Sequence, residues 1–232
     1  MTRMLASVNS LAEAKLVYQA GADIIDLKQP EAGALGALPL ETIAQIRAWC
    51  AGRTPISATV GDLPMQPALI GDAVLAMAAT RVDYIKIGFF PGGDWLGVVQ
   101  KLAELTQKQY PLIAVLFADT QPDPTFVETL QQAGFAGVML DTMDKNRGSL
   151  THAIPLNVIE RFVDTAKSHN LLCGLAGSLR LTDIPALLRF QPDYLGFRGA
   201  LCIQHKRTAN LDGEAVKHIK KAIQTGMTLE TG

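Results

Sequence analysis

A chain of 232 residues, 48% of them hydrophobic, can form a large core, and no Ser-, Pro- or charge-rich linker divides it, so one domain spanning 1–232 is expected. Its net charge of −1 and the mixing of basic and acidic residues exclude the positive stripe that binds nucleic acid. Three scattered cysteines and the lack of an apolar run of roughly 18 residues exclude a disulfide framework and a membrane span, so a cytoplasmic protein that binds small molecules is predicted.

Eight short apolar runs rich in β-forming residues follow one another, and each is expected to be a strand. They lie at residues 4–8, 23–28, 56–62, 83–90, 112–119, 137–141, 171–178 and 193–199. The stretches between them have helical spacing. In the first, Asn9 or Ser10 can cap the start of a helix and Gly21 can end it. The junctions AGADII, RVDYIKI, AGFAGVML and QPDYLGF repeat, as expected of a chain built from strand–helix units.

The number of these units predicts the fold class. Eight of them within 232 residues are typical of a (β/α)8 TIM barrel of the α/β class, which usually needs about 250 residues and here has little room for an inserted domain. An open doubly wound sheet is the alternative, but the first strand–helix turn, ASVNSLAEA, lacks the glycine-rich dinucleotide fingerprint. A single-domain TIM barrel is therefore expected.

Polar residues interrupt several strands that should be apolar on both faces. With a period of two, Asp26 and Lys28 point toward the barrel axis from the second strand and Lys86 from the fourth. Asp141 points inward from the sixth strand and Arg198 from the eighth. Even-numbered strands share interior layers, and active sites lie at the carboxyl ends of barrel strands. We therefore expect Lys28 and Lys86 to be close neighbours, with Asp26 one layer beneath Lys28 and Asp141 opposite.

Two inward lysines suit amine catalysis. Free lysine has a pKa of about 10.4, so attack on a carbonyl near neutral pH needs a pKa lowered by roughly three units. Burial lowers it in part, and a second cation nearby is expected to lower it more. The neutral amine then forms a Schiff base, while Asp26, Asp141 and the second lysine orient groups and move protons. No metal and no cofactor is required, and the histidines show no metal-ligand spacing.

The same residues also have a purely structural interpretation. Asp26 with Lys28, and Lys86 with Asp141, would then be salt bridges that fill the barrel interior. Buried ion pairs often fail to stabilise a protein relative to apolar side chains. Two such pairs and an arginine would be an unusual choice for structure alone, which favours the catalytic interpretation.

Glycine-rich turns follow the last two expected strands, GLAGS at 174–178 and FRGAL at 197–201. TIM barrels often bind phosphate at this position on backbone N–H groups, so a phosphorylated substrate is expected. The expected cradle has Arg198 as its charge partner and is formed by Gly177, Ser178, Gly199 and Ala200. The alternative is that these glycines only turn a strand into a helix.

The loop after the sixth strand, LDTMDKNRGSL at 140–150, adds Lys145 and Arg147. Basic residues on a loop at the barrel mouth can clamp a phosphate or close a lid. A solvated charge cluster is an equally open interpretation of the same residues.

Five segments together resemble the (5-formylfuran-3-yl)methyl phosphate synthase family across essentially the whole chain: DLKQPEAGALGA, YIKIGF, LDTMDKNRGSL, GLAGSL and DYLGFRGALC. The resemblance implies a lyase-type synthase that joins two molecules of glyceraldehyde 3-phosphate, with loss of phosphate and water, for methanofuran or a related one-carbon carrier. It implies Lys28 as the Schiff-base lysine and Lys86 as the proton acceptor. The segment CIQHKRTANLD has fewer glycines than expected of such relatives, so no phosphate contact is assigned to it.

Two other functions remain open. Another class I aldolase that acts on a sugar phosphate would use the same amine. A non-catalytic barrel that serves as a partner subunit is the second, and the intact inward Lys28, Lys86, Asp26 and Asp141 argue against it. Many small barrels pair through their helical shells, so a homo-oligomer is compatible with this sequence.

Overall fold

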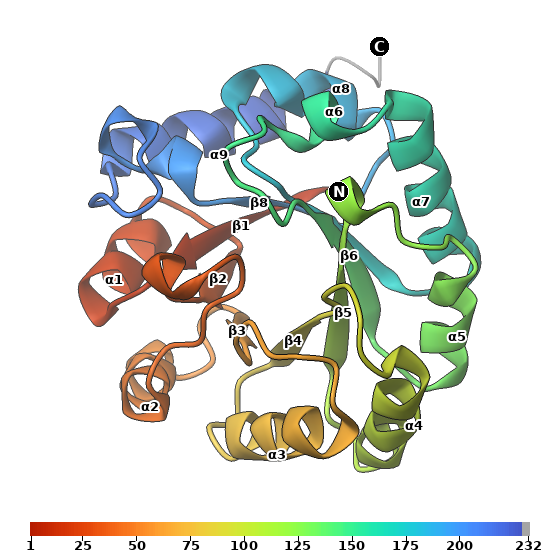
Figure 1. The fold of residues 1–232 in the computed structure, drawn as a ribbon. Coiled ribbons are helices and arrows are strands. Elements are labelled where there is room, and N and C mark those ends of the chain that lie inside the picture. Colours follow the sequence, from red (N-terminus) through yellow and green to blue (C-terminus); the bar gives the residue numbers. More distant parts are fainter. Residues whose placement is uncertain (229–232) are drawn as a thin grey trace.

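The computed structural model describes residues 1–228, and its strands close into a barrel (Figure 1). Each strand pairs in parallel with the next, and β8 pairs with β1 to complete the ring. The strands are β1 (Arg3–Val8), β2 (Ile24–Leu27), β3 (Ile56–Thr59), β4 (Tyr84–Gly88), β5 (Leu112–Phe117), β6 (Gly137–Asp141), β7 (Leu172–Leu175) and β8 (Tyr194–Phe197). This confirms the TIM barrel predicted from the sequence, and only β1 begins before its expected run.

Helices surround the ring of strands (Figure 1). Those within residues 1–228 are α1 (Leu11–Gln19), α2 (Leu40–Cys50), α3 (Pro67–Ala78), α4 (Trp95–Thr106), α5 (Phe126–Gln132), α6 (Leu150–Ala153), α7 (Leu156–Ser168), α8 (Ile184–Leu188) and α9 (Gly213–Thr228). The connection from β6 to β7 contains two helices because Pro155 separates α6 from α7. A residue before proline disfavours the helical conformation, and Ile154 is accordingly extended, with φ −142° and ψ 154°.

Both ends of α1 follow the expected signals. The Ser10 side chain accepts a hydrogen bond from the N–H of Glu13 and caps the start of the helix. Gly21 follows the end of the helix with φ +89°, a left-handed conformation that glycine adopts without steric cost.

An aspartate placed just before an even-numbered strand joins that strand to its neighbour. Asp23, Asp83 and Asp193 precede β2, β4 and β8, and each accepts a hydrogen bond of 2.7 to 2.8 Å from an N–H at the start of the preceding strand. These bonds pair backbone donors that would otherwise lack a partner at the amino-terminal end of the barrel. The aspartate that recurs in three of the junctions therefore fixes strand ends.

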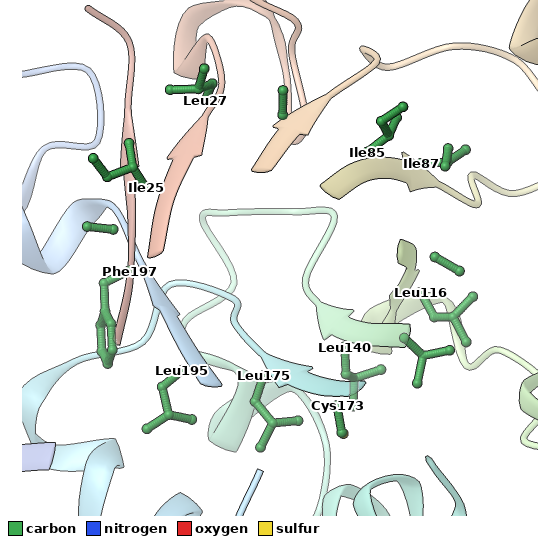
Figure 2. Close-up of a cluster of buried hydrophobic side chains, with 14 of the residues drawn as sticks. Ile25, Leu27, Ile85, Ile87, Leu116, Leu140, Cys173, Leu175, Leu195 and Phe197 are labelled. Atoms are coloured by element: carbon green, nitrogen blue, oxygen red, sulfur yellow. The ribbon is translucent and has the colours of Figure 1, made fainter. Parts of the chain in front are cut away.

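The strands alternate strictly between two environments. Figure 2 shows apolar side chains, among them Ile25, Leu27, Ile85 and Ile87, pointing away from the barrel axis, where they join the large core beneath the helices. A second, smaller apolar cluster lies on the interior side of the strands and includes Ile24, Ile113 and Tyr194. The alternation predicted for β2 and β4 is confirmed, and it leaves the charged side chains at the carboxyl ends of the strands.

No helix within residues 1–228 combines the length and the apolar character of a membrane span. In that same part of the chain, no group of three His, Cys, Asp or Glu side chains is arranged to hold a metal ion. The cytoplasmic location, the lack of nucleic-acid binding and the oligomeric state stay predictions.

Candidate active site

A cavity of about 290 Å³ opens at the carboxyl ends of the strands. Its walls come from β1, β2, β4, β6 and β8 and from the segments that follow β2, β6, β7 and β8. Asp26, Lys28, Lys86 and Asp141 all line it. The structure therefore brings together the four side chains that the sequence singled out for chemistry.

Three side chains hold the Asp26 carboxylate in this cavity. The register of β1, β2 and β3 places Ser7, Asp26 and Ser57 side by side, and both hydroxyls donate to the carboxylate, at 2.9 Å from Ser7 and 2.6 Å from Ser57. The Lys86 amine lies 2.9 Å from Asp26 Oδ1, and both residues are almost fully buried. Burial alone would raise the pKa of Asp26, but the charges of Lys86 and Lys28 and the hydrogen bonds outweigh it and hold that pKa below its usual value.

Asp141 forms a second pair on the far side of the ring. The Lys145 amine lies 2.6 Å from Asp141 Oδ1, and the N–H of Thr142 donates to the same oxygen at 2.7 Å. The carboxylate of Asp119 accepts from two N–H groups of the loop that carries Lys145, which fixes the start of this loop. Burial opposes ionisation of Asp141, yet Lys145 and Lys28 keep its pKa lowered.

Lys28 is left without a partner. Both carboxylates of the cavity are paired with other amines, and no residue among 1–228 forms a hydrogen bond or ion pair with the Lys28 side chain. The pairing of Asp26 with Lys28 and of Lys86 with Asp141, which the structural interpretation of the sequence required, is therefore wrong. The carboxylate of Asp26 is directed to Lys86 by the two serines, so the Lys28 amine faces the cavity alone.

The pKa of Lys28 is lowered to about 8. Burial is the largest cause; the carboxylate of Asp141 opposes it, and the ammonium of Lys145 adds to it. The sequence had suggested that the second lysine of the pair would contribute more than burial. That order is wrong: Lys86 is paired with Asp26, and its charge lowers the pKa of Lys28 less than burial and the charge of Lys145 do.

Two glycines shape the loop that follows Lys28. A side chain at Gly33 would collide with Asp62, whose carboxylate accepts hydrogen bonds of 2.7 Å from the next two N–H groups of the loop. A side chain at Gly36 would lie 2.4 Å from the Gln29 carbonyl oxygen. The N–H of Gln29 donates to the Gly36 carbonyl at 2.7 Å and closes the loop. The glycines of the motif after Lys28 are therefore required by close packing.

The turns after β7 and β8 present free backbone donors to the cavity. Gly177 and Ser178 have φ of +108° and +47°, and a Cβ at Gly177 would lie 2.9 Å from a Thr142 methyl carbon. Within residues 1–228, nothing accepts a hydrogen bond from the N–H groups of Gly177, Ser178 or Gly199, and all three residues line the cavity. Three residues of the expected phosphate cradle are thus available to an anion.

Nearly the whole sequence matches a known family. A model of the 4-HFC-P synthase family matches residues 4–220. The chain belongs to this family. A (5-formylfuran-3-yl)methyl phosphate synthase of Methanocaldococcus jannaschii is 33% identical over 230 residues, which cover 94% of this chain and 98% of that protein. A Methylorubrum extorquens protein to which the same name is given provisionally is 42% identical over 224 residues, covering 97% of this chain and 92% of that protein.

Solved structures share the barrel with this 4-HFC-P synthase family member but little of its sequence. Phosphoribosyl anthranilate isomerase from Thermus thermophilus matches with a TM-score of 0.70 at 14% identity, covering 97% of this chain and 99% of that one. 3-Hexulose-6-phosphate synthase from Salmonella typhimurium matches with a TM-score of 0.70 at 13% identity, covering 97% of this chain and 100% of that one. Identities this low show the fold alone.

In this member of the 4-HFC-P synthase family, the Arg198 side chain braces the protein itself. Its guanidinium pairs with Glu13 at 2.5 Å and donates to the backbone carbonyls of Ser7, Arg207 and Ala209 at 2.8 to 3.2 Å. A second bond to Glu13 engages the last of its five N–H donors. This geometry disfavours the phosphate contact predicted for Arg198. The Arg198 side chain instead holds the loop after β8 against β1 and α1.

We expect the Glu13→Gln variant to lower the free energy of unfolding by about 3 kcal/mol, because Arg198 would then remain buried without a counter-charge. Urea unfolding followed by circular dichroism measures this. Glu214→Gln is the matched control, since Glu214 forms an exposed pair with Lys217 that contributes little. Equal urea midpoints for the two variants would contradict the bracing role.

Two other predicted phosphate ligands lie away from the cavity. Arg147 is exposed and lines a separate hollow with Asp119 and His152, so the structure does not bring it to Lys28. The Ala200 side chain packs into the apolar core beneath the helices. Of the two basic residues on this loop, only Lys145 lines the cavity, where its amine contacts Asp141.

Sequence reasoning missed several residues that line the cavity. Arg180 comes from the turn after β7, and Lys206 and Arg207 come from the segment after β8 to which no phosphate contact was assigned. The adjacent basic residues at 206 and 207, directly after the last barrel strand, were the available signal. Ser7 is the hydroxyl-bearing residue in the otherwise apolar run at 4–8, and this exception could have indicated a hydrogen-bond partner for Asp26.

Proposed function

We propose that this protein condenses two molecules of glyceraldehyde 3-phosphate into (5-formylfuran-3-yl)methyl phosphate through a Schiff base on Lys28. The observation that carries the proposal is the Lys28 amine, which is buried, unpaired and shifted to a pKa of about 8 inside a cavity rich in cations. The names of its relatives support the product. The furan would serve methanofuran or a related one-carbon carrier, as the resemblance of the sequence implies.

In the proposed first step, the neutral Lys28 amine attacks the carbonyl carbon of one triose phosphate, and loss of water leaves a protonated imine. The imine withdraws electrons, so a proton can leave the adjacent carbon to give an enamine. The Lys86–Asp26 pair accepts and returns this proton, since the two groups already share a hydrogen bond of 2.9 Å.

The enamine then expels the phosphate from its C3, and C3 of the resulting enol attacks C2 of the second triose phosphate, which has isomerised to its ketone form, so that the carbon–carbon bond forms. Asp141 and Lys145 line the same cavity as Lys86 and can exchange protons with the oxygen that develops charge. Ring closure and the loss of two molecules of water give the aromatic furan, and hydrolysis of the imine releases Lys28. Aromaticity makes the final dehydration strongly favourable.

Incubation with glyceraldehyde 3-phosphate alone tests the proposal directly. We expect a furan aldehyde absorbance to appear together with inorganic phosphate, and mass spectrometry to identify (5-formylfuran-3-yl)methyl phosphate. A linear sugar phosphate in place of the furan would indicate another class I aldolase. No product and no imine on Lys28 would indicate a barrel without this catalytic role.

The pH dependence of Lys28 reactivity follows from its lowered pKa. The reactive form is the neutral amine, which is populated above the pKa, so acylation of Lys28 by a trace of acetic anhydride should rise through a midpoint at about pH 8. A free lysine side chain would show its midpoint at about 10.4. Peptide mass spectrometry of the labelled protein measures the midpoint, and a value of 10 or above for Lys28 would remove the basis for an activated amine.

A further inference from the structure

The cavity carries more positive charge than the proposed chemistry needs. Seven lysine and arginine side chains line it against two carboxylates, although the whole chain has a net charge of −1. Lys86, Lys145 and Arg198 are paired with carboxylates. Within residues 1–228, the four others have no carboxylate partner: Lys28, Arg180, Lys206 and Arg207. An excess of unpaired cations in a cavity attracts polyanionic ligands.

Arg207 is the best placed of these four for binding an anion. One of its N–H donors bonds the carbonyl of Gly33 at 2.7 Å, which directs the guanidinium from the loop after β8 toward the loop after β2. The side chain is half-buried, lines the cavity and interacts electrostatically with Asp141 across it. In residues 1–228, its remaining donors have no acceptor.

Hydrogen bonds from Arg198 hold the backbone of Arg207 in place. The carbonyl of Arg207 accepts from Arg198 Nε at 2.8 Å, and the carbonyl of Ala209 accepts from Arg198 Nη2 at 3.2 Å. Arg198 is itself fixed by Glu13. A guanidinium that is anchored through its own backbone and by one bond at its tip loses little freedom on binding a ligand, as a pre-organised site requires.

This position is separate from the cradle after β7. The Gly177 backbone packs against Thr142, and the Ser178 hydroxyl donates to the Lys145 carbonyl at 3.3 Å, so the cradle borders the loop after β6. Arg207 reaches the loop after β2. In the order of strands around the ring, β7 and β2 are separated by β8 and β1.

We infer that Arg207, supported by Lys206 on the rim, forms a second binding position for a phosphate monoester, on the side of the cavity that carries Lys28. The inference rests on the proposed function in one respect: two triose phosphates bring two phosphoryl groups into the cavity, and the product keeps one. The N–H groups at Gly177 and Ser178 hold one of them. The guanidinium of Arg207 holds the other through paired, charge-assisted hydrogen bonds.

Binding of inorganic phosphate tests this position without any catalytic turnover. Equilibrium dialysis with labelled phosphate should find two bound phosphates per wild-type chain and one per Arg207→Ala chain. Arg207→Lys should keep the second phosphate with an affinity weakened about 10-fold, since lysine binds phosphate as a point charge. Arg189→Ala is the control, because Arg189 is exposed at the end of α8 and lies outside the cavity, and it should bind two.

A second measurement distinguishes an anion ligand from a residue that only tethers the loop. If Arg207 binds the anion, guanidinium ion added far below denaturing concentrations should restore the second phosphate to Arg207→Ala; if Arg207 only tethers the loop, it should not. Borohydride trapping on Lys28 should survive in the Arg207→Ala variant. In furan synthesis, Arg207→Ala should raise KM for glyceraldehyde 3-phosphate about 10- to 100-fold. One phosphate per wild-type chain, or two in Arg207→Ala, would overturn the inference. Two phosphates without furan formation would refute the proposed function and leave this inference intact.

Discussion

Lys28→Met is expected to abolish imine formation and to lower the rate of furan synthesis by about 1,000-fold or more, because no other buried amine that lines the cavity within residues 1–228 is free to act as the nucleophile. Lys86 and Lys145 are each held by a carboxylate. The variant should fold with unchanged or greater stability. The wild-type protein buries the Lys28 amine without a partner, and methionine fills a similar volume without a charge to desolvate.

Borohydride reduction in the presence of glyceraldehyde 3-phosphate provides the measurement. The wild-type protein should gain the mass of one reduced triose phosphate, and peptide mapping should place it on Lys28. Lys108→Ala is the control, since Lys108 is exposed and lies outside the cavity, and it should be trapped as the wild type is. A Lys28→Met protein that makes furan at the normal rate, or an adduct on another lysine, would reject the proposed mechanism.

Asp26→Asn and Lys86→Met are each expected to lower both stability and rate. Either change breaks an ion pair whose members are almost fully buried and leaves one charge without compensation, which typically costs about 3 to 5 kcal/mol. Each also removes one half of the proposed proton-transfer pair, which is expected to slow catalysis by about 100- to 10,000-fold.

The double variant separates these two effects. Asp26→Asn with Lys86→Met has no unpaired charge, and the new amide can accept from one of Ser7 and Ser57 and donate to the hydroxyl of the other, so most of the lost unfolding free energy should return. The rate should not return. Denaturant unfolding and initial rates on the same samples give both quantities, and Glu104→Gln, which breaks an exposed pair with Lys101, is the control. Recovery of rate together with stability would show that the pair is structural only.

The positions of the charged side chains followed from the sequence, but their pairing did not. A period of two in β2 and β4 is enough to place Asp26, Lys28 and Lys86 in the interior. Which carboxylate meets which amine depends on the stagger of neighbouring strands and on hydroxyls from β1 and β3, which are far away in the chain. Sequence spacing suggested that Asp26 pairs with Lys28. In the structure, hydrogen bonds from Ser7 and Ser57 direct the Asp26 carboxylate toward Lys86 instead.

Among the residues predicted to bind phosphate, too, some could be recognised from the sequence and others only from the structure. Gly177 and Ser178 were recognised because a glycine-rich turn after a late barrel strand has a local signature. Arg198 was predicted to bind phosphate from its position alone, and the structure engages all its donors with Glu13 and backbone carbonyls. No phosphate contact was predicted for Arg207, because its loop carries no recognisable motif. A long side chain on an irregular loop has no periodicity from which its direction can be read.

The sequence by itself determined the eight-stranded barrel, the inward face of each charged strand and the family, because hydrophobic alternation, turn residues and motif spacing are local properties of the chain. Only the tertiary structure decided that Lys28 is the amine left unpaired, that burial is the main cause of its lowered pKa, and that Arg207 rather than Arg198 offers free donors to the cavity. These outcomes depend on competition among charges that the closed barrel brings together from distant segments, and on how deeply it buries each of them.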